Sequence, residues 1–337
     1  MVKDSQMRFF NAFGATGGTG DTCREFRELL TPLVDSIKTD RFGNVLGYKS
    51  CGIPGAAKIL LETHIDQPGF MVTQITDRGF LQCMEMGAER WLPAGQEVRI
   101  KAADGKIYSG TVSLPPVGAQ SCSPASNSYL TVDVGMAFSQ AVERFHIGDL
   151  MLPYTDVSDL GENFLCGSSL SCRAGAVVLL EALTLLINQS IRADLIIAAC
   201  TDIEAGRTIA WDELPDCSVS LGTINAECVG NDVPDAIAAG MGPVISIGAN
   251  SIPSLARKMA AHASDNSIPY QLSAASGDTG TGAWYIQTVG NGIPTVAVSI
   301  PVKYMHSSSE TLHTEDTKSA SRLIACFLSN FCGRQII

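Results

Sequence analysis

The sequence LLETHIDQPGF, at residues 60–70, combines the pattern of a buried strand with two polar side chains at its end. The apolar run ends at His64, Asp66 follows two positions later, and Gly69 comes after that. A short apolar run bounded by polar residues and glycine is typical of a buried β-strand. Side chains at positions i and i+2 of a strand lie on the same face. The pattern therefore predicts a strand that ends by directing an imidazole and a carboxylate the same way.

Helical and strand patterns alternate along most of the chain. Apolar residues recur at helical spacing in residues 21–38, 173–190, 251–267 and 314–331. Apolar strand patterns occur in residues 193–204, 217–229 and 293–302. Pro32 interrupts the first helical pattern, and Thr314 is a candidate N-cap of the last. This alternation favours an α/β fold, with a mixed or parallel sheet covered by helices.

Residues 70–155 have a different character. Short strand patterns such as FMVTQITD, GFLQCMEM and SYLTVDVG alternate there with turn residues. We therefore predict a small β-rich domain at residues 70–155, inserted into an α/β domain that is formed by residues 1–69 and 156–337.

Composition argues against several classes of partner and location. The chain of 337 residues has a net charge of −11, and such an acidic protein repels the phosphates of nucleic acids. No run reaches the roughly 18 apolar residues of a membrane helix, and MVKDSQMRFF lacks the apolar segment of a signal peptide. The eleven cysteines form no CxxC pair, so we expect reduced thiols in a cytoplasmic protein.

Polar side chains stand at the ends of three predicted strands. His64 and Asp66 end the first, Asp202 and Glu204 end the second, and His306 follows the third. Ligands of open α/β sheets bind at the carboxyl ends of the strands, and imidazole with carboxylate suits zinc, cobalt or manganese. A structural, hydrogen-bonded histidine is the alternative at each position, and spacing alone does not decide between the two.

Several segments resemble the M42 family of metallo-aminopeptidases, which includes glutamyl and deblocking aminopeptidases and so-called endoglucanases. TDRFGNVLGYK is similar to that family's D-x-x-G-N segment, and THIDQPGFMV to its A-H-x-D-E-x-G-F motif. YLTVDVG is similar to its I-D-x-G segment, and GAWYIQTVGNGIPTVAVSIPVKYMHSSSE to its last third. The resemblance covers nearly the whole chain.

The resemblance implies a zinc-peptidase-like α/β domain with an inserted β-barrel-like dimerisation domain. It also implies peptide substrates, a homo-oligomer that is a dimer or a dodecamer, and an active site with two divalent metal ions such as zinc or cobalt. His64, Glu204 and His306 match metal ligands of the family, and Asp66 matches the Asp that supports the first of them. Glu227 takes the place of the last ligand if one gap is allowed, and Ala226 does so without a gap.

Other positions depart from the family pattern. The L-D-N-R motif, whose Asp bridges the two metals, is LSCR here, with Ser171 in the Asp position. Ile203 stands in the position of the general base, Gln67 replaces the Glu of the H-x-D-E motif, and Gly282 replaces the Asp of T-D-A-W. An isoleucine accepts no proton, and loss of a general base lowers rates by about 10²–10⁴-fold.

Three hypotheses therefore stand together. The first is an M42-like aminopeptidase with impaired or altered catalysis. The second is a non-catalytic homologue that serves as a binding or structural protein. The third is a hydrolase with a rebuilt single-metal site, in which Cys172 or Cys228 supplies a thiolate ligand. The number of bound metal ions distinguishes them.

Overall fold

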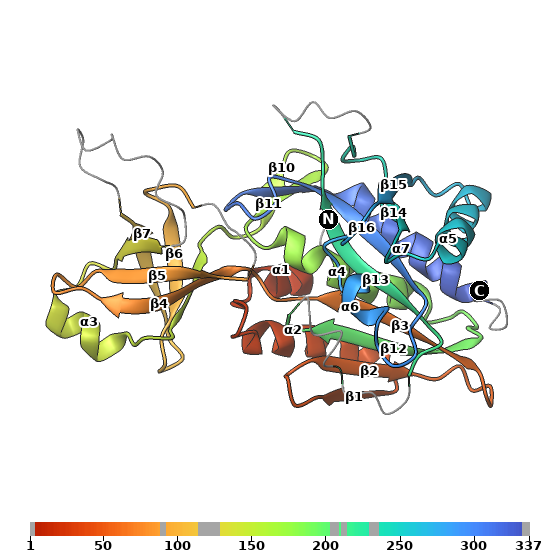
Figure 1. The fold of residues 1–337 in the computed structure, drawn as a ribbon, viewed down its shortest axis with the longest axis horizontal. Helices are drawn as coiled ribbons and strands as arrows, with labels where there is room; N and C mark the ends of the chain where they lie inside the picture. Colours follow the sequence, from red (N-terminus) through yellow and green to blue (C-terminus); the bar gives the residue numbers. More distant parts are fainter. Residues whose placement is uncertain are drawn as a thin grey trace.

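The computed structural model describes residues 4–87, 92–113, 129–202, 209, 214–228 and 236–331. These residues form a large α/β part and a small β-barrel that stands to one side of it (Figure 1). The predicted fold class, a mixed sheet with helices and a small β-rich module, is confirmed. None of the helices in the described part of the chain has the length and hydropathy of a membrane span.

The α/β part is built on an 11-stranded sheet. Its main path runs in the order β1 (Ser36–Thr39), β2 (Val45–Lys49), β12 (Ala193–Cys200), β3 (Ala57–His64), β13 (Cys217–Asn225), β16 (Thr295–Lys303), β17 (Glu310–His313), β11 (Phe164–Gly167) and β10 (Ser158–Leu160). Two further strands, β14 (Val244–Gly248) and β15 (Gln271–Ala275), pair beside β16. The central strands β12, β3, β13 and β16 are mutually parallel, so their carboxyl ends lie at one edge.

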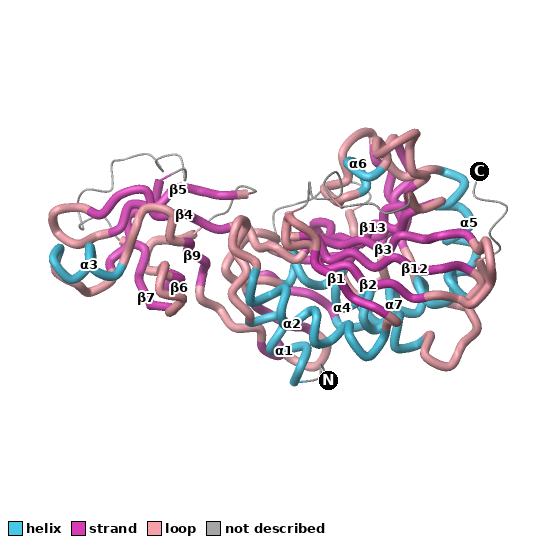
Figure 2. Tube along the Cα trace, turned by 90° about the horizontal axis from the view of Figure 1, so that it is seen from below, coloured by secondary structure: helices cyan, strands magenta, loops and turns pink. Residues whose placement is uncertain are grey.

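Helices cover both faces of this sheet unequally. The helices of the α/β part are α1 (Asp4–Asn11), α2 (Gly20–Leu30), the 3-10 helix η1 (Thr31–Leu33), α4 (Leu170–Leu185), α5 (Pro253–Asp265), α6 (Ala283–Ile286) and α7 (Thr314–Ser329). Figure 2 shows α1, α2, α4 and α7 on one side of the sheet and the short α6 on the other.

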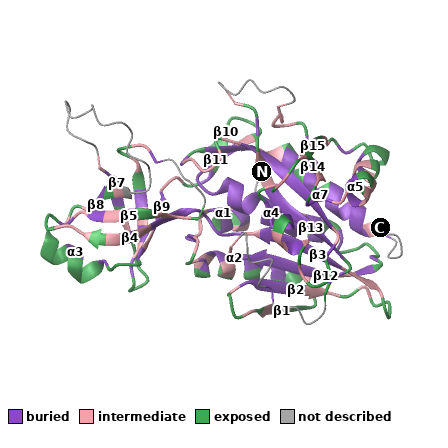
Figure 3. Ribbon diagram, in the orientation of Figure 1, coloured by how far each residue is buried: buried purple, intermediate pink, exposed green. Residues whose placement is uncertain are grey.

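The main core lies between the sheet and α4. Most residues of α4 are buried (Figure 3), because the helix packs against the sheet and against α7. Gly175 permits this close approach: a Cβ atom there would lie 2.5 Å from Thr63 Oγ1 and 2.9 Å from the carbonyl oxygen of Leu221. The helix that carries Ser171 is therefore packed directly on β3 and β13.

The barrel closes through β4, β5, β8, β7, β6 and β9 in that order. These strands and the helix beside them are β4 (Gly69–Ile75), β5 (Leu81–Met86), β6 (Glu97–Lys101), β7 (Ile107–Val112), β8 (Tyr129–Asp133), α3 (Phe138–Arg144) and β9 (Leu150–Pro153). Its own core includes Phe70, Leu81 and Ile100. Because β4 begins five residues after His64, the barrel leaves the sheet beside the predicted site.

Two local predictions were wrong at the ends of elements. The helical pattern of residues 21–38 ends as α-helix at Leu30, because Pro32 cannot donate to the preceding turn; the chain continues as η1 and then as β1. Thr314 is the first residue of α7 and not its N-cap. The cap is His313, whose Nδ1 accepts a hydrogen bond from the N–H of Glu315 at 3.3 Å.

Candidate active site

The carboxyl end of β3 holds the His64 ring in a fixed orientation. Its Nδ1 lies 3.0 Å from Asp66 Oδ1. The other oxygen of Asp66, Oδ2, accepts a hydrogen bond from Thr16 Oγ1 at 2.6 Å. A carboxylate that is hydrogen-bonded to one ring nitrogen of a histidine fixes the tautomer and raises the basicity of the other ring nitrogen. Nε2 of His64 is thus the atom prepared for a ligand or a proton.

The surroundings of His64 favour a positive charge. Burial by itself would lower the pKa of His64, because it penalises the imidazolium. The hydrogen bond and charge of Asp66, together with the charge of Glu62, outweigh burial and raise the pKa. A proton or a metal cation at this ring would be stabilised by the same neighbours.

A buried carboxylate, Glu310, joins the start of α4 to the loop that carries His306. Its Oε1 accepts hydrogen bonds from Ser171 Oγ at 2.6 Å and from the N–H of His306 at 2.8 Å. Its Oε2 accepts from the N–H of Ser171 at 2.7 Å. Three donors on one fully buried carboxylate compensate for its desolvation. The Ser171 hydroxyl is therefore already engaged as a donor.

The His306 loop has an unusual backbone. His306 has φ of 64° and Tyr304 has φ of 56°, both in the left-handed region that side chains other than glycine rarely adopt. Such conformations persist where surrounding contacts impose them, and they cluster at functional sites. The hydrogen bond from the His306 N–H to Glu310 is one such contact.

These side chains meet at a cavity of about 550 Å³. The residues that line it come mainly from the loop before α2, the ends of β3 and β13, the start of α4, and the loops before α6 and after β16. They are Thr16, His64, Asp66, Pro68, Gly87, Ser171, Cys172, Asp202, Thr223, Ile224, Asn225, Thr279, Gly280, Met305 and His306. We call it the His64–His306 cavity. It lies at the carboxyl ends of the parallel strands, where open α/β sheets bind ligands.

The structure brings together six of the residues that the sequence singles out: His64, Asp66, Ser171, Cys172, Asp202 and His306. Two others, Glu204 and Ile203, lie outside the described residues. Their roles stay predictions.

Glu227 follows β13 and is not among the described residues that line the cavity. Glu227 is exposed, and its N–H donates to the carbonyl oxygen of Ile237 at 2.7 Å. It is Asn225, the last residue of β13, that lines the cavity. Asn225 is a polar residue at a strand end, the same signal that points to His64, and sequence reasoning missed it.

The described residues do not fit a centre with two metal ions. No group of three or more His, Cys, Asp or Glu side chains among them is arranged to hold a metal. Two ions about 3.5–4 Å apart need a shared ligand such as a carboxylate. Ser171 offers a neutral hydroxyl instead, and that hydroxyl donates to Glu310. For one ion, the described part of the cavity lining supplies the imidazoles of His64 and His306, the carboxylate of Asp202 and the thiol of Cys172.

Glu62 is an acidic residue below the cavity that sequence reasoning missed. It lies two residues before His64 on the same face of β3 and is fully buried. Its Oε2 accepts a hydrogen bond from Ser220 Oγ at 2.6 Å, and the thiol of Cys200 is a further hydrogen-bonding neighbour of the carboxyl group. Burial raises the pKa of Glu62 from 4.5 to about 7, against the opposing effects of Ser220, His64 and Cys200.

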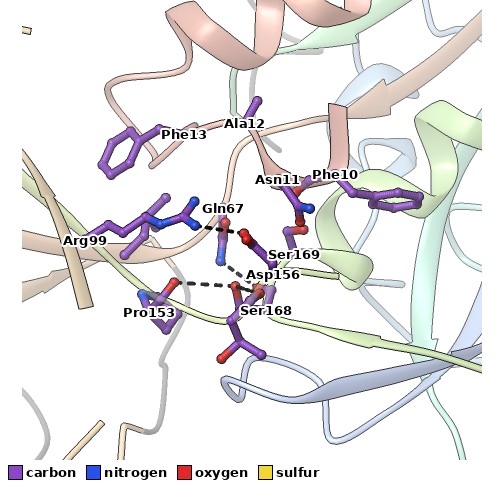
Figure 4. Close-up of a pocket in the computed structure, with 12 residues that line it drawn as sticks. Phe10, Asn11, Ala12, Phe13, Gln67, Arg99, Pro153, Asp156, Ser168 and Ser169 are labelled. Carbon is purple, nitrogen blue, oxygen red and sulfur yellow. Dashed lines mark hydrogen bonds and ion pairs between the residues drawn. The ribbon is translucent and has the colours of Figure 1, made fainter. Parts of the chain in front are cut away.

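A second, smaller cavity of about 20 Å³ lies where the barrel joins the sheet (Figure 4). It is large enough for about one water molecule. Beside it, the buried Gln67 donates from Nε2 to the carbonyl oxygen of Ser168 at 2.6 Å, and Arg99 of the barrel pairs with Asp156 at 2.8 Å. An ionised glutamate at position 67 would have no proton to donate to Ser168. The amide therefore ties the loop after β3 to the segment before α4.

Comparisons with known proteins give relatives along nearly the whole chain. A profile of the M42 glutamyl aminopeptidase family matches residues 43–323. The lysyl aminopeptidase of Pyrococcus furiosus is 26% identical over 317 residues, which cover 89% of each chain. The solved aminopeptidase APDkam598 of Desulfurococcus kamchatkensis has a TM-score of 0.88 at 29% identity and covers 98% of this chain and 95% of its own. The TET1 peptidase of Pyrococcus horikoshii, which can assemble into a tetrahedron or a large octahedral shell, has a TM-score of 0.82 at 25% identity, with 97% and 99% covered.

The Glu310 network gives a prediction about stability. Glu310→Gln replaces one accepting oxygen by an NH₂ group that faces donors from Ser171 or His306. We expect the free energy of unfolding to fall by about 2–4 kcal/mol, measured by urea denaturation. The control, Glu28→Gln at an exposed position of α2, should change it by less than about 0.5 kcal/mol. Equal effects of the two variants would contradict the role given to Glu310.

The raised pKa of Glu62 predicts a pH dependence. The folded protein keeps a proton on Glu62 up to about pH 7, whereas the unfolded chain releases it near 4.5. The contribution of Glu62 to stability is therefore fully present below about pH 4.5 and is lost as the pH rises through about 7, by about 3 kcal/mol in all. Glu62→Gln should remove this loss between pH 5 and pH 8, and the exposed Glu97→Gln should not. If the free energy of unfolding depends on pH in the same way in the wild type and in Glu62→Gln, Glu62 is not the group that titrates.

Proposed function

Because the chain belongs to the M42 glutamyl aminopeptidase family, we propose that it binds peptides at the His64–His306 cavity and that its hydrolysis of N-terminal residues is impaired. The observation that carries this proposal is Ser171, whose hydroxyl donates to Glu310 at the cavity wall. The site so built keeps the imidazoles of His64 and His306 for one cation or for a polar ligand, but position 171 lacks the carboxylate that would hold two ions together.

The chemistry of peptide hydrolysis explains the expected loss. The attacking water must lose a proton to a base, and a metal or another electrophile must polarise the carbonyl group. If Ile203 occupies the position of the base, the barrier rises by about 3–5 kcal/mol, since each factor of ten corresponds to about 1.4 kcal/mol. A loosely held metal pair would add to this. Both effects lower the rate without removing the cavity or its capacity to bind.

A second candidate is a hydrolase with a single metal ion and a thiolate ligand. Cys172 lines the cavity, with its Sγ 3.5 Å from Ser171 Oγ. Thiolates bind zinc well. Metal analysis of the untreated purified protein separates the candidates: two ions per chain support an ordinary aminopeptidase, one ion that is lost in Cys172→Ala supports the thiolate site, and none supports a binding protein.

The activity test compares the native chain with a restored variant. We expect the native protein to hydrolyse aminoacyl anilides weakly or not at all, even with added zinc or cobalt. The double variant Ser171→Asp plus Ile203→Glu should gain activity, because it returns a metal-bridging carboxylate and a base. Ser171→Asn plus Ile203→Gln is the matched control, with similar side-chain sizes and no new charge. Turnover of the native chain at about 1–1000 per second would refute the proposal.

Ser171→Asp alone gives a second readout that does not require activity. Ser171 Oγ lies 2.6 Å from Glu310 Oε1, so a carboxylate at position 171 would repel that of Glu310. A cation between them would remove the repulsion. We expect zinc to raise the melting temperature of Ser171→Asp more than that of the wild type; equal shifts would show that no metal reaches position 171.

We also propose that the chain forms at least a dimer through the barrel. Large apolar side chains are exposed there, including Met84, Ile107 and Ile147, and Phe138 and Val142 share one face of α3. Assembly of the TET1 relative supports an oligomer.

The assembly test is light scattering after size exclusion at micromolar concentration. The wild type should be at least a dimer, and Phe138→Glu plus Val142→Glu should be smaller. Ile187→Glu, at an exposed apolar residue of the α/β part, should leave the size unchanged. A monomeric wild type would contradict the proposal.

A further inference from the structure

Gly282 is a glycine whose backbone does not require glycine. Its φ and ψ are −57° and −15°, in the right-handed helical region open to every residue. Space is what excludes a side chain there. A Cβ atom at position 282 would lie 2.4 Å from both carboxyl oxygens of Glu62, closer than any non-bonded contact between such atoms. A side chain at position 282 therefore requires the buried Glu62 carboxyl group to move.

The Glu62 carboxyl group is fixed on two sides. Ser220 of the neighbouring strand β13 donates to Oε2, and the backbone of Gly282 packs against both oxygens. The residues just before Gly282 include Thr279 and Gly280, which line the His64–His306 cavity. The side chain of Glu62 thus lies between its own strand, β3, and the segment that carries Thr279 and Gly280.

We propose that Glu62 is a positioning residue that holds the segment 279–282 at the cavity wall, and that positions 62 and 282 are two alternative attachment points for one buried carboxyl group. A carboxyl group carried on the Cβ of residue 282 would occupy the volume that the Glu62 carboxyl group fills now, because Cδ of Glu62 lies 2.5 Å from that Cβ position. Ser220 would remain within reach as its donor. The inference is independent of whether the protein hydrolyses peptides.

The first test concerns the exclusion. Gly282→Ala should lower the melting temperature by more than about 5 °C, because the added Cβ displaces a fully buried carboxyl group. Gly277→Ala is the matched control in the preceding loop, because a Cβ there has no neighbour within 4 Å. Glu62→Ala plus Gly282→Ala should be more stable than the two single losses predict. If Gly282→Ala and Gly277→Ala have the same melting temperature, the close contact is absent and the proposal fails.

The second test moves the carboxyl group. Gly282→Asp alone should be strongly destabilised, since two carboxyl groups compete for one space, and Glu62→Ala alone should lose stability because Ser220 loses its acceptor. Glu62→Ala plus Gly282→Asp should recover most of the melting temperature. A double variant no more stable than the less stable single variant would overturn the proposal.

The geometry of the cavity supplies a readout that stability alone would not move. Carbethoxylation of the five histidines, followed by mass spectrometry, reports the accessibility of each ring. Measured well below the melting temperature, Glu62→Ala should change the rate at His306 by more than about twofold and leave His262 on α5 unchanged, and the relocated carboxyl group should restore it. His64 is not used as a readout, because the charge of Glu62 acts on its ring directly. An unchanged rate at His306 in Glu62→Ala would show that Glu62 supports the fold without positioning the cavity wall, which would overturn its role.

Discussion

The carboxylate of Glu310 is the contact that ties the cavity to the fold. It accepts hydrogen bonds from Ser171 at the start of α4 and from the backbone of His306. These two residues are 135 positions apart in the chain, and Glu310 itself begins β17. A buried carboxylate is tolerated only where donors replace its lost hydration. This one carboxylate therefore joins the start of α4 to the strained turn at His306.

The site also lies where the chain passes from the sheet into the barrel, between β3 and β4. Thr16 donates its hydroxyl proton to Asp66 and its N–H to the carbonyl oxygen of Gln67, and the N–H of Gln67 donates to Gly14. The loop before α2 thus holds the residues that follow His64, immediately before the chain enters β4. Any movement of the barrel relative to the sheet would act on the support of His64, because the same short segment carries both.

Departures from the family motif are matched by neighbouring residues. The hydroxyl of Ser171 donates a hydrogen bond to Glu310, and the absence of a side chain at Gly282 leaves space for Glu62. The amide of Gln67 donates to the carbonyl oxygen of Ser168, which an ionised carboxylate has no proton to do. Each exchange keeps buried polar groups in contact with suitable partners, and this satisfies the main energetic demand on a packed interior.

Local pattern determined much of this protein. The two-residue period places His64 and Asp66 together, and the alternation of helical and strand patterns predicts the covered sheet and the separate β-rich module, because these features arise between neighbours along the chain. The strand-end position of Asn225 was visible in the sequence, whereas the roles of Glu310, Thr16 and Glu62 were decided by the tertiary structure alone. Thr16 reaches Asp66 across 50 residues and Glu62 reaches Ser220 across 158, and no short-range periodicity encodes such contacts. Whether a polar residue becomes part of a site depends on which distant donor folding brings to it, because only that partner offsets the cost of burial.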